Sequence, residues 1–269
     1  MSKTHIPRKR FGQNFLVDTS VIEQIVDNVN PQSDENIVEI GPGKGALTFP
    51  LLQRCKRLTV IELDRDLVSA LQKATYKAEQ KGQVLRVISS DALAFDFSAY
   101  SQSEAGKLRI VGNLPYNIST PILFHLLNAA DVIEDMHFML QREVVDRMCA
   151  APGSKAYGRL SVMLQWQCRV QGLFAVPSTA FKPAPRVESA TVRIVPKALS
   201  DTERSLGPTL EKVVTAAFAM RRKTLRNSLA KWIDAPTMTL LGIDPTARAE
   251  TLQIDDFCRI AKQVTQTSD

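Results

Sequence analysis

Ile37-Val38-Glu39-Ile40-Gly41-Pro42-Gly43-Lys44-Gly45 is the segment most informative about the class of fold. Its first four residues predict a short buried strand. The three glycines that follow predict a sharp turn, with backbone N–H groups exposed at the start of a helix. Because the spacing is GxGxG and not GxGxxG, the turn departs from the dinucleotide-binding fingerprint. The stretch therefore indicates a strand, a ligand-binding turn and a helix in direct succession.

Strand-like and helix-like segments alternate through the part of the chain that follows. The apolar runs at residues 58–61, 84–88, 108–111 and 136–140 predict four more strands. Apolar residues at helical spacing lie between them, as at residues 67–73. This alternation is typical of parallel βαβ units in a doubly wound sheet, which binds ligands at the carboxyl ends of its strands. We therefore predict an α/β fold.

The pattern changes after Pro152-Gly153. A helix is expected at residues 160–166. Two strands are expected at residues 169–176 and 190–195, with a long Pro-rich turn between them. Such a pair fits an antiparallel addition at the edge of the sheet.

The C-terminal part shows only helical patterns from Pro208 onward, with Pro236 and Pro245 as expected breaks. With 269 residues, of which 44% are hydrophobic, the chain can bury a sizeable core and still form a second, small domain. We therefore predict an α/β domain at residues 1–196 and a small helical domain at residues 197–269.

Acidic side chains follow two of the predicted strands. Glu62 ends the strand at residues 58–61, where a carboxylate can accept hydrogen bonds from both hydroxyls of a ribose. Asp91 follows the strand at residues 84–88 and can accept from an adenine amino group, although it also fits an N-cap for the segment after it. A plain surface carboxylate is the alternative for Glu62. Together with Gly41, these positions predict one cleft for a ligand that contains adenosine.

Asn113-Leu114-Pro115-Tyr116 follows another predicted strand. The Asn113 side-chain oxygen and the Leu114 carbonyl can each accept one N–H of an adenine N6 amine, and Tyr116 can stack on the base. Pro115 holds the Leu114 carbonyl in an extended geometry. A strand followed by a turn with a half-buried tyrosine is the alternative. Since a base-modifying motif has no use in hydride transfer, the predicted ligand is S-adenosylmethionine rather than NAD.

Phe181 stands before Pro183 and Pro185 in a stiff loop. It is a candidate to stack on the opposite face of the base, and each stacked base is worth about 1–3 kcal/mol. A core anchor beneath that loop is the alternative. Because a base inside a duplex is inaccessible, the target must lie in a loop or be flipped out.

The net charge of +6 favours a polyanionic partner. Basic residues gather in several clusters, the last of which comprises Arg221, Arg222, Lys223 and Arg226. One such cluster alone is typical of a solvated surface, but several in one chain indicate nucleic acid. The chain has no apolar run near the ~20 residues that cross a bilayer, and its cysteines lack paired spacing. We therefore expect a cytoplasmic protein with no membrane partner and no metal site.

Six segments together resemble the ribosomal RNA small-subunit adenine N6,N6-dimethyltransferases of the bacterial KsgA type. They are residues 11–18 (FGQNFLVD), 39–48 (EIGPGKGALT), 61–64 (IELD), 112–119 (GNLPYNIS), 181–189 (FKPAPRVES) and 221–227 (RRKTLRN). The resemblance runs from about Arg8 to Asn227 and is far more specific than any one motif. It implies a Rossmann-like class I S-adenosylmethionine-dependent methyltransferase sheet with a small C-terminal helical domain.

By this resemblance the substrate is 16S ribosomal RNA within an immature 30S subunit. Two adjacent adenosines in its 3′-terminal hairpin loop would each receive two methyl groups on N6 during late subunit biogenesis. The cofactor-binding residues that the family implies, the first two closing over the cofactor, are Asn14, Leu16, Gly41, Gly43, Glu62, Asp91 and Asn113. The basic cluster at residues 221–226 would bind RNA. A monomer is expected for a protein that docks on a much larger particle.

Three alternatives stay open at this point. The macrolide-resistance methyltransferases of large-subunit RNA share the early motifs, but the segment at residues 221–227 and the helical tail favour the small-subunit type. An assembly or transcription factor could keep the fold without catalysis, although the motifs of the site are intact. DNA adenine methyltransferases usually carry Pro-Pro-Tyr after the acidic or amide residue, whereas Leu114 replaces the first proline here.

Overall fold

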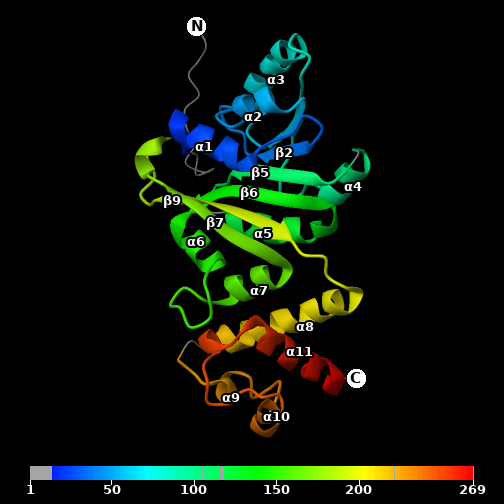
Figure 1. Ribbon diagram of the computed structural model, residues 1–269, viewed down its shortest axis with the longest axis vertical. Coiled ribbons are helices and arrows are strands. Elements are labelled where there is room, and N and C mark those ends of the chain that lie inside the picture. Colours follow the sequence, from blue (N-terminus) through cyan, green and yellow to red (C-terminus); the bar gives the residue numbers. More distant parts are fainter. Residues whose placement is uncertain (1–13, 105, 116–117, 221, 269) are drawn as a thin grey trace. The chain divides into compact units, whose positions relative to one another are not determined.

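The computed structural model describes residues 14–104, 106–115, 118–220 and 222–268 of the chain. The chain divides into two compact units. Unit 1 comprises Met1–Val145 and Gln171–Pro196, and unit 2 comprises Asp146–Val170 and Lys197–Asp269. Figure 1 shows the strands gathered in the first unit and α8 to α11 in the second.

A seven-stranded sheet is the centre of unit 1, with the strand order β4-β3-β2-β5-β6-β9-β7 (Figure 1). The strands are β2 (Asn36–Ile40), β3 (Arg57–Glu62), β4 (Val84–Ser89), β5 (Leu108–Asn113), β6 (Ile133–Gln141), β7 (Cys168–Val176) and β9 (Ser189–Pro196). Neighbouring strands from β4 to β6 are parallel, and β9 is antiparallel to β6. The predicted parallel sheet with an antiparallel addition is therefore confirmed.

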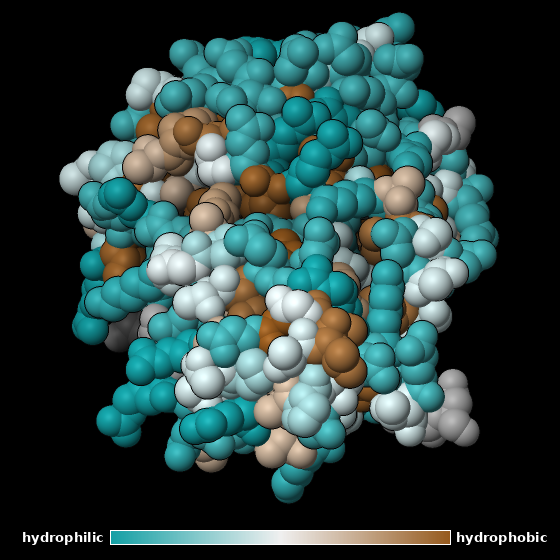
Figure 2. All heavy atoms as spheres, turned by 60° about the horizontal axis from the view of Figure 1, so that its bottom comes forward, coloured by the Kyte–Doolittle hydropathy of each residue, from teal (hydrophilic) through white to brown (hydrophobic). Residues whose placement is uncertain are grey.

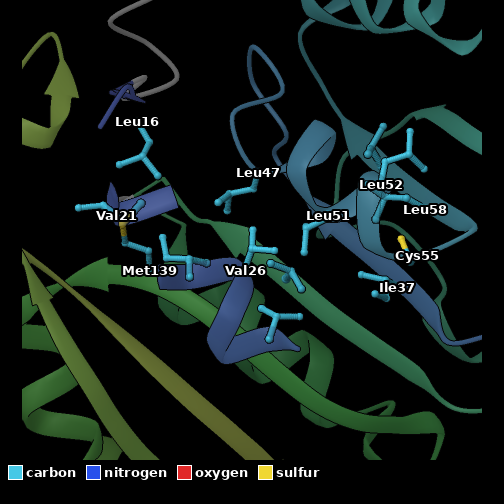
Figure 3. Packing of buried hydrophobic residues seen from close by; sticks show 14 of the residues in the cluster. Leu16, Val21, Val26, Ile37, Leu47, Leu51, Leu52, Cys55, Leu58 and Met139 are labelled. Carbon is cyan, nitrogen blue, oxygen red and sulfur yellow. The ribbon is translucent and has the colours of Figure 1, made fainter. Parts of the chain in front are cut away.

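Helices cover the sheet because its central strands are apolar on both faces. β2 is buried along its whole length, as expected for a parallel strand between two helical layers. The helices that connect the strands are α1 (Thr19–Val29), α2 (Thr48–Arg54), α3 (Arg65–Glu79), α4 (Phe97–Gln102), α5 (Ser119–Leu127) and α6 (Arg142–Met148). Figure 3 shows the core in which Val21 and Val26 of α1, Leu51 of α2 and Met139 of β6 pack together.

Helix α1 was not among the sequence predictions. It begins after Asp18, whose carboxylate accepts hydrogen bonds from the backbone N–H groups of Ser20 (2.9 Å) and Val21 (3.2 Å). Before it lies the short strand β1 (Phe15–Leu16), which pairs antiparallel with β8 (Phe181–Lys182). These two strands form a small separate sheet.

A cluster of charged side chains around the buried Asp135 joins β5, β6 and β9. Asp135 is 1% exposed and accepts hydrogen bonds from Arg109 Nε (2.8 Å), Arg193 Nη2 (2.9 Å) and His137 Nε2 (3.1 Å). Arg109 also donates to Glu35 at 2.7 Å. Burial alone would raise the pKa of Asp135, but the hydrogen bonds from His137 and Arg109 outweigh it and hold that pKa well below its usual range. We call these five residues the Asp135 cluster.

Unit 2 is helical. Its helices are α7 (Arg159–Gln167), α8 (Asp201–Phe218), α9 (Leu225–Ser228), α10 (Ala235–Leu240) and α11 (Ile254–Ser268). Helix α8 begins before Pro208, because Ser200 and Glu203 form a reciprocal capping box. Pro236 lies in the first turn of α10, where proline is favoured, so the break expected there falls just before it, between α9 and α10, and Pro245 lies in the break between α10 and α11. Among the described residues no helix is long and apolar enough to span a membrane.

The compact units differ from the predicted domains at residues 146–170, which pack in unit 2. Gln165 Nε2 of α7 donates to the carbonyls of Met148 and Ala150, both at 2.8 Å. The Trp166 ring lies so close to Gly207 of α8 that a Cβ there would approach it to 3.1 Å. The reason is that α7 buries its apolar side chains against helices that are far away in the sequence.

Candidate active site

A pocket opens in unit 1 at the carboxyl ends of β2, β3, β4 and β5. Its wall combines the glycine turn, the residues that follow β3 and β4, the segment Asn113-Leu114-Pro115 and residues 14–16 around β1. Parallel strands bring their carboxyl ends to one edge of a sheet, which is why residues so distant in the sequence meet. The structure thus brings together the predicted residues Asn14, Leu16, Gly41, Gly43, Glu62, Asp91, Asn113 and Leu114.

The glycine turn adopts a backbone conformation that side chains disfavour. Gly41, Gly43 and Gly45 have φ angles of +67°, +57° and +85°. A Cβ at Gly45 would lie within 2.4 Å of the Phe49 ring. At Gly43 it would lie 3.2 Å from the ring of Phe15. Glycine is therefore required both for the turn and for the close approach of its neighbours.

Glu62 closes one side of the pocket. It is 8% exposed, and its carboxylate accepts hydrogen bonds from the backbone N–H groups of Leu63 (2.9 Å), Asp64 (2.9 Å) and Gly43 (3.2 Å). Burial raises the pKa of Glu62, and these hydrogen bonds offset part of the rise. The carboxylate therefore holds the glycine turn against the end of β3, which excludes the plain surface role.

Glu39 is a pocket residue that the sequence reasoning did not select. It is 1% exposed within β2, and its carboxyl group accepts a hydrogen bond from the Thr48 hydroxyl at 2.6 Å. Burial raises the pKa of Glu39 to about 8, and the nearby charge of Glu62 acts in the same direction. A charged residue inside an otherwise apolar strand, directly before the glycine turn, was the signal that could have found it.

Asp91 lies on the pocket wall and stabilises its own turn. Its Oδ1 accepts a hydrogen bond from the backbone N–H of Leu93 at 2.9 Å. The segment that follows forms a turn and no helix, so the carboxylate caps a turn rather than a helix. The helix N-cap alternative is therefore not realised, and the binding role of Asp91, which lines the pocket, stays a prediction.

Asn113 is the last residue of β5 and Leu114 follows it, and both line the pocket. Asn113 Nδ2 donates to the backbone carbonyl of Asn14 at 3.3 Å. The Leu114 N–H donates to the Met139 carbonyl at 3.2 Å, which ties this residue to β6. No donor among the described residues occupies the Leu114 carbonyl. Both predicted acceptors, the Asn113 Oδ1 and the Leu114 carbonyl, therefore belong to one rigid strand end.

Gly112 sets the distance between β5 and β2. A Cβ at this position would lie 2.7 Å from the backbone oxygen of Ile40, closer than real contacts allow. Glycine is therefore needed for the strand that carries Asn113 to pack against the strand that carries the glycine turn.

Residues 14–16 cover one side of the pocket. Leu16 is 5% exposed and packs in the core, while Lys44 Nζ lies 4.6 Å from the centre of the Phe15 ring. The N–H of Val17 donates to the Ala180 carbonyl at 2.9 Å. The cover is therefore held from both β8 and the glycine turn.

The sequence profile of the ribosomal RNA adenine dimethylases matches residues 4–266 of the chain. The chain belongs to this family. It is 53% identical over 270 residues to a ribosomal RNA small subunit methyltransferase A from Idiomarina loihiensis, covering 99% of this chain and 92% of that protein. A protein of the same name from Chromobacterium violaceum is 52% identical over 264 residues, covering 98% and 97%. The predicted class of enzyme, a ribosomal RNA adenine methyltransferase, is confirmed.

Two solved structures share the fold of this dimethylase. A dimethyladenosine transferase from Plasmodium falciparum superposes with a TM-score of 0.80 at 22% identity, covering 94% of this chain and 98% of that one. The 23S rRNA methyltransferase ErmE gives a TM-score of 0.71 at 24% identity, covering 94% and 100%. The predicted class I methyltransferase sheet with C-terminal helices is confirmed by these likenesses, which concern the fold alone.

Phe181 of the dimethylase lies in the core. Its side chain is 2% exposed and packs with Leu16, Val176 and Ala180. The structure therefore favours the core-anchor alternative over the predicted stacking on a base. The reason is the pairing of β8 with β1, which directs this ring into the apolar layer beneath the cover.

Two of the other residues predicted to contact the substrate, Tyr116 and Arg221, lie outside the described residues of the dimethylase. Arg222, Lys223 and Arg226 belong to unit 2 and are exposed. They surround the start of α9, whose Leu225 is fully buried and holds this segment in place. Their role in binding RNA stays a prediction.

Proposed function

We propose that this dimethylase transfers methyl groups from S-adenosylmethionine to N6 of two adjacent adenosines in 16S ribosomal RNA. The adenosines lie in the 3′-terminal hairpin loop within an immature 30S subunit, and the products are N6,N6-dimethyladenosines. The observation that carries the proposal is one pocket that joins acceptors for an amine, on Asn113 and Leu114, to the glycine turn and Glu62. The relatives that are about half identical are named for small-subunit ribosomal RNA.

The pocket fits S-adenosylmethionine through three kinds of group. The glycine turn offers backbone N–H groups, and the carboxylates of Glu62 and Asp91 can accept from ribose and adenine. Leu63, which is 50% exposed, and Leu93 supply an apolar wall for a flat ring. Bound there, S-adenosylmethionine supplies an electrophilic methyl group on its sulfonium.

Asn113 and Leu114 orient the amine of the target adenine. The lone pair of N6 is delocalised into the ring, so the nitrogen is a weak nucleophile at rest. Hydrogen bonds from its two N–H groups to the Asn113 Oδ1 and the Leu114 carbonyl favour a pyramidal nitrogen whose lone pair points into the pocket. No strong base is required, because the nitrogen becomes acidic only after it has bonded to carbon. Catalysis is therefore mainly positioning and dipole stabilisation.

The second methylation uses the same groups with one contact fewer. After the first transfer the nitrogen keeps a single N–H, so only one of the two acceptors can hold it. The first methyl must then rotate away from the acceptor that it displaces. The described pocket keeps Asn113 partly exposed, which leaves space beside its side chain.

Unit 2 supplies the surface that fits ribosomal RNA. Arg222, Lys223 and Arg226 are exposed together, and a phosphate backbone would release counterions on binding them. Figure 2 shows a mostly hydrophilic surface with small hydrophobic areas on the face that it presents. We propose that the protein acts in the cytoplasm as a monomer, as fits an enzyme that docks on a large particle.

The decisive experiment offers labelled S-adenosylmethionine with immature small subunits, naked 16S RNA and duplex DNA in parallel. Digestion and chromatography then identify the methylated nucleosides. The wild type should give N6,N6-dimethyladenosine from the subunits, and Asn113→Ala should lower the rate by ~10²–10³-fold while the cofactor still binds. Asn28→Ala changes an exposed asparagine of α1 and should keep the wild-type rate.

Three results would contradict the proposal or a part of it. Labelled adenine from duplex DNA alone would assign the enzyme to DNA. Binding to subunits without any methyl transfer would favour an assembly factor that keeps the fold without catalysis. Undiminished turnover by Asn113→Ala would refute the assigned role of the amide.

A further inference from the structure

The contact between Asn14 and Asn113 determines which way the catalytic amide points. An asparagine side chain has one end that accepts and one that donates. Nδ2 of Asn113 donates to the Asn14 backbone carbonyl at 3.3 Å, so its Oδ1 is directed to the other side. Both residues line the pocket. The acceptor that the substrate amine requires is therefore selected by a backbone group of another segment.

The segment that provides this carbonyl is itself anchored. Leu16 pairs with Phe181, and the Val17 N–H donates to the Ala180 carbonyl at 2.9 Å. Figure 3 shows the Leu16 side chain above Val21 and Met139, in the same core. The Asn14 carbonyl is thus held by a strand that packs independently of the substrate.

We propose that the Asn14 carbonyl is a positioning group that orients the Asn113 amide, and that this is why position 113 requires an amide rather than a carboxylate. The inference rests on the proposed function, since it explains how the acceptor for the adenine amine is presented. A carboxylate would accept the amine hydrogen equally well, but it has no N–H for Asn14. Two oxygens would then face each other, which repels the cover from the pocket.

Asn113→Asp separates this inference from a simple acceptor role. If position 113 only accepts a hydrogen bond, the aspartate variant should be active. If the Asn14 carbonyl needs a hydrogen-bond donor at position 113, the variant should lose roughly 10- to 100-fold in rate near pH 8, with the loss mainly in kcat. The rate relative to wild type should recover as the pH falls, because a protonated carboxyl can donate to the Asn14 carbonyl, and partial burial opposite that carbonyl should raise the pKa of the new carboxyl above the ordinary value of about 3.9. Asn113→Ala has no group to protonate and should show no recovery.

The other titrating groups do not confuse this comparison. The titratable side chains that share the described pocket wall with Asn113 are Glu39, Lys44, Glu62 and Asp91. They are present in the wild type and in both variants, so their titration is common to all three profiles. The matched control is Asn28→Asp, which makes the same substitution at an exposed asparagine whose Nδ2 donates to the Gln24 carbonyl at 2.8 Å.

Amide hydrogen exchange at Val17 gives a second readout that needs neither RNA nor cofactor. The Val17 N–H donates to Ala180, the residue directly before β8, so its exchange reports whether the cover stays attached there. We expect faster exchange in Asn113→Asp at neutral pH than in the wild type, with slower exchange once the carboxyl is protonated. A wild type that transfers no methyl groups would contradict the proposed function, whereas the exchange data would still decide the contact.

The inference is overturned if Asn113→Asp keeps the wild-type rate, or if its rate falls while Val17 exchange is unchanged. A loss that persists unchanged at low pH also overturns it. If the aspartate variant does not fold, Asn113→Ala decides: faster Val17 exchange in this variant than in Asn28→Asp supports the contact, and equal exchange refutes it.

Discussion

Unit 1 buries carboxylates in two regions, and the pKa of the carboxylate is lowered in one region and raised in the other. In the Asp135 cluster, Asp135 meets two arginines and a histidine, and its pKa is lowered. At the pocket, Glu39 and Glu62 receive hydrogen bonds from a hydroxyl and from backbone N–H groups, and no cation among the described residues pairs with them. Their pKa values are raised. Desolvation is common to both regions, so the difference is the presence of compensating charge.

This difference separates a structural cluster from a binding site. A carboxylate that is fully paired within the protein contributes to holding strands together. One that is buried beside an open pocket without a cation is poised for a ligand that brings positive charge. S-adenosylmethionine carries such charge on its sulfonium and its ammonium group. Under the proposed function, the positive charge of the bound ligand compensates the carboxylates that have no cation partner in the protein.

The largest effect is expected from breaking the Asp135 cluster. Asp135→Asn should lower the free energy of unfolding by about 3–5 kcal/mol, because the buried Arg109 loses the charge that compensates it. Urea unfolding measures the change. The matched control is Asp27→Asn, since Asp27 pairs with Arg54 at 2.6 Å with side chains 64% and 42% exposed, and should cost less than about 1 kcal/mol. Equal losses in the free energy of unfolding for the two variants would show that the buried pairing of Asp135 stabilises the fold no more than an exposed ion pair does.

A smaller effect of the opposite sign is expected from Glu39→Gln. Because the pKa of Glu39 is raised to about 8, the folded wild type should lose stability as the pH rises from the ordinary value for glutamate through about 8. Glutamine cannot ionise and still accepts from Thr48. The variant should therefore be more stable than the wild type at pH 9, by roughly a few kcal/mol, and similar to it near pH 5. Thermal unfolding of both proteins from pH 5 to pH 9 measures the difference. If Glu39 were ionised at neutral pH, the pH profiles of stability of the variant and the wild type would be parallel.

The smallest effect is expected from Glu62→Gln. Replacing a carboxylate oxygen by an amide removes one charged acceptor for the ribose, so affinity for S-adenosylmethionine should fall roughly 10- to 100-fold. Calorimetric titration measures it. The exposed Glu23 of α1 gives the control Glu23→Gln, which should bind like the wild type. An unchanged affinity in Glu62→Gln would mean that this carboxylate only holds the glycine turn.

Much of the pocket was predictable because its residues are tied to strand ends. Gly41, Glu62, Asp91 and Asn113 each follow a short apolar run, and parallel strands present their carboxyl ends together. The fold class followed from the same alternation. Local sequence patterns were therefore enough to place a residue on the pocket wall wherever it follows the end of a strand.

The Asp135 cluster shows what the sequence could not reveal. Arg109 and Asp135 are directly opposite each other only because β5 and β6 pair in one register, with an irregularity beside Leu108. A register shift by one residue would place these side chains on opposite faces. The burial of Phe181 depends on a similar pairing, between β8 and a strand of two residues that has no periodic pattern to predict it.

The absence of a side chain at Gly112 restricts where the pocket can make room for a second methyl group. A Cβ at Gly112 would collide with the backbone oxygen of Ile40, so the close packing of β5 against β2 fixes the distance between Asn113 and the glycine turn. A target that grows by one methyl between two rounds must find its extra space elsewhere. Under the proposed function, that space is the part of the pocket beside the half-buried Asn113 side chain, because residues 14–16 are held by the core and by β8.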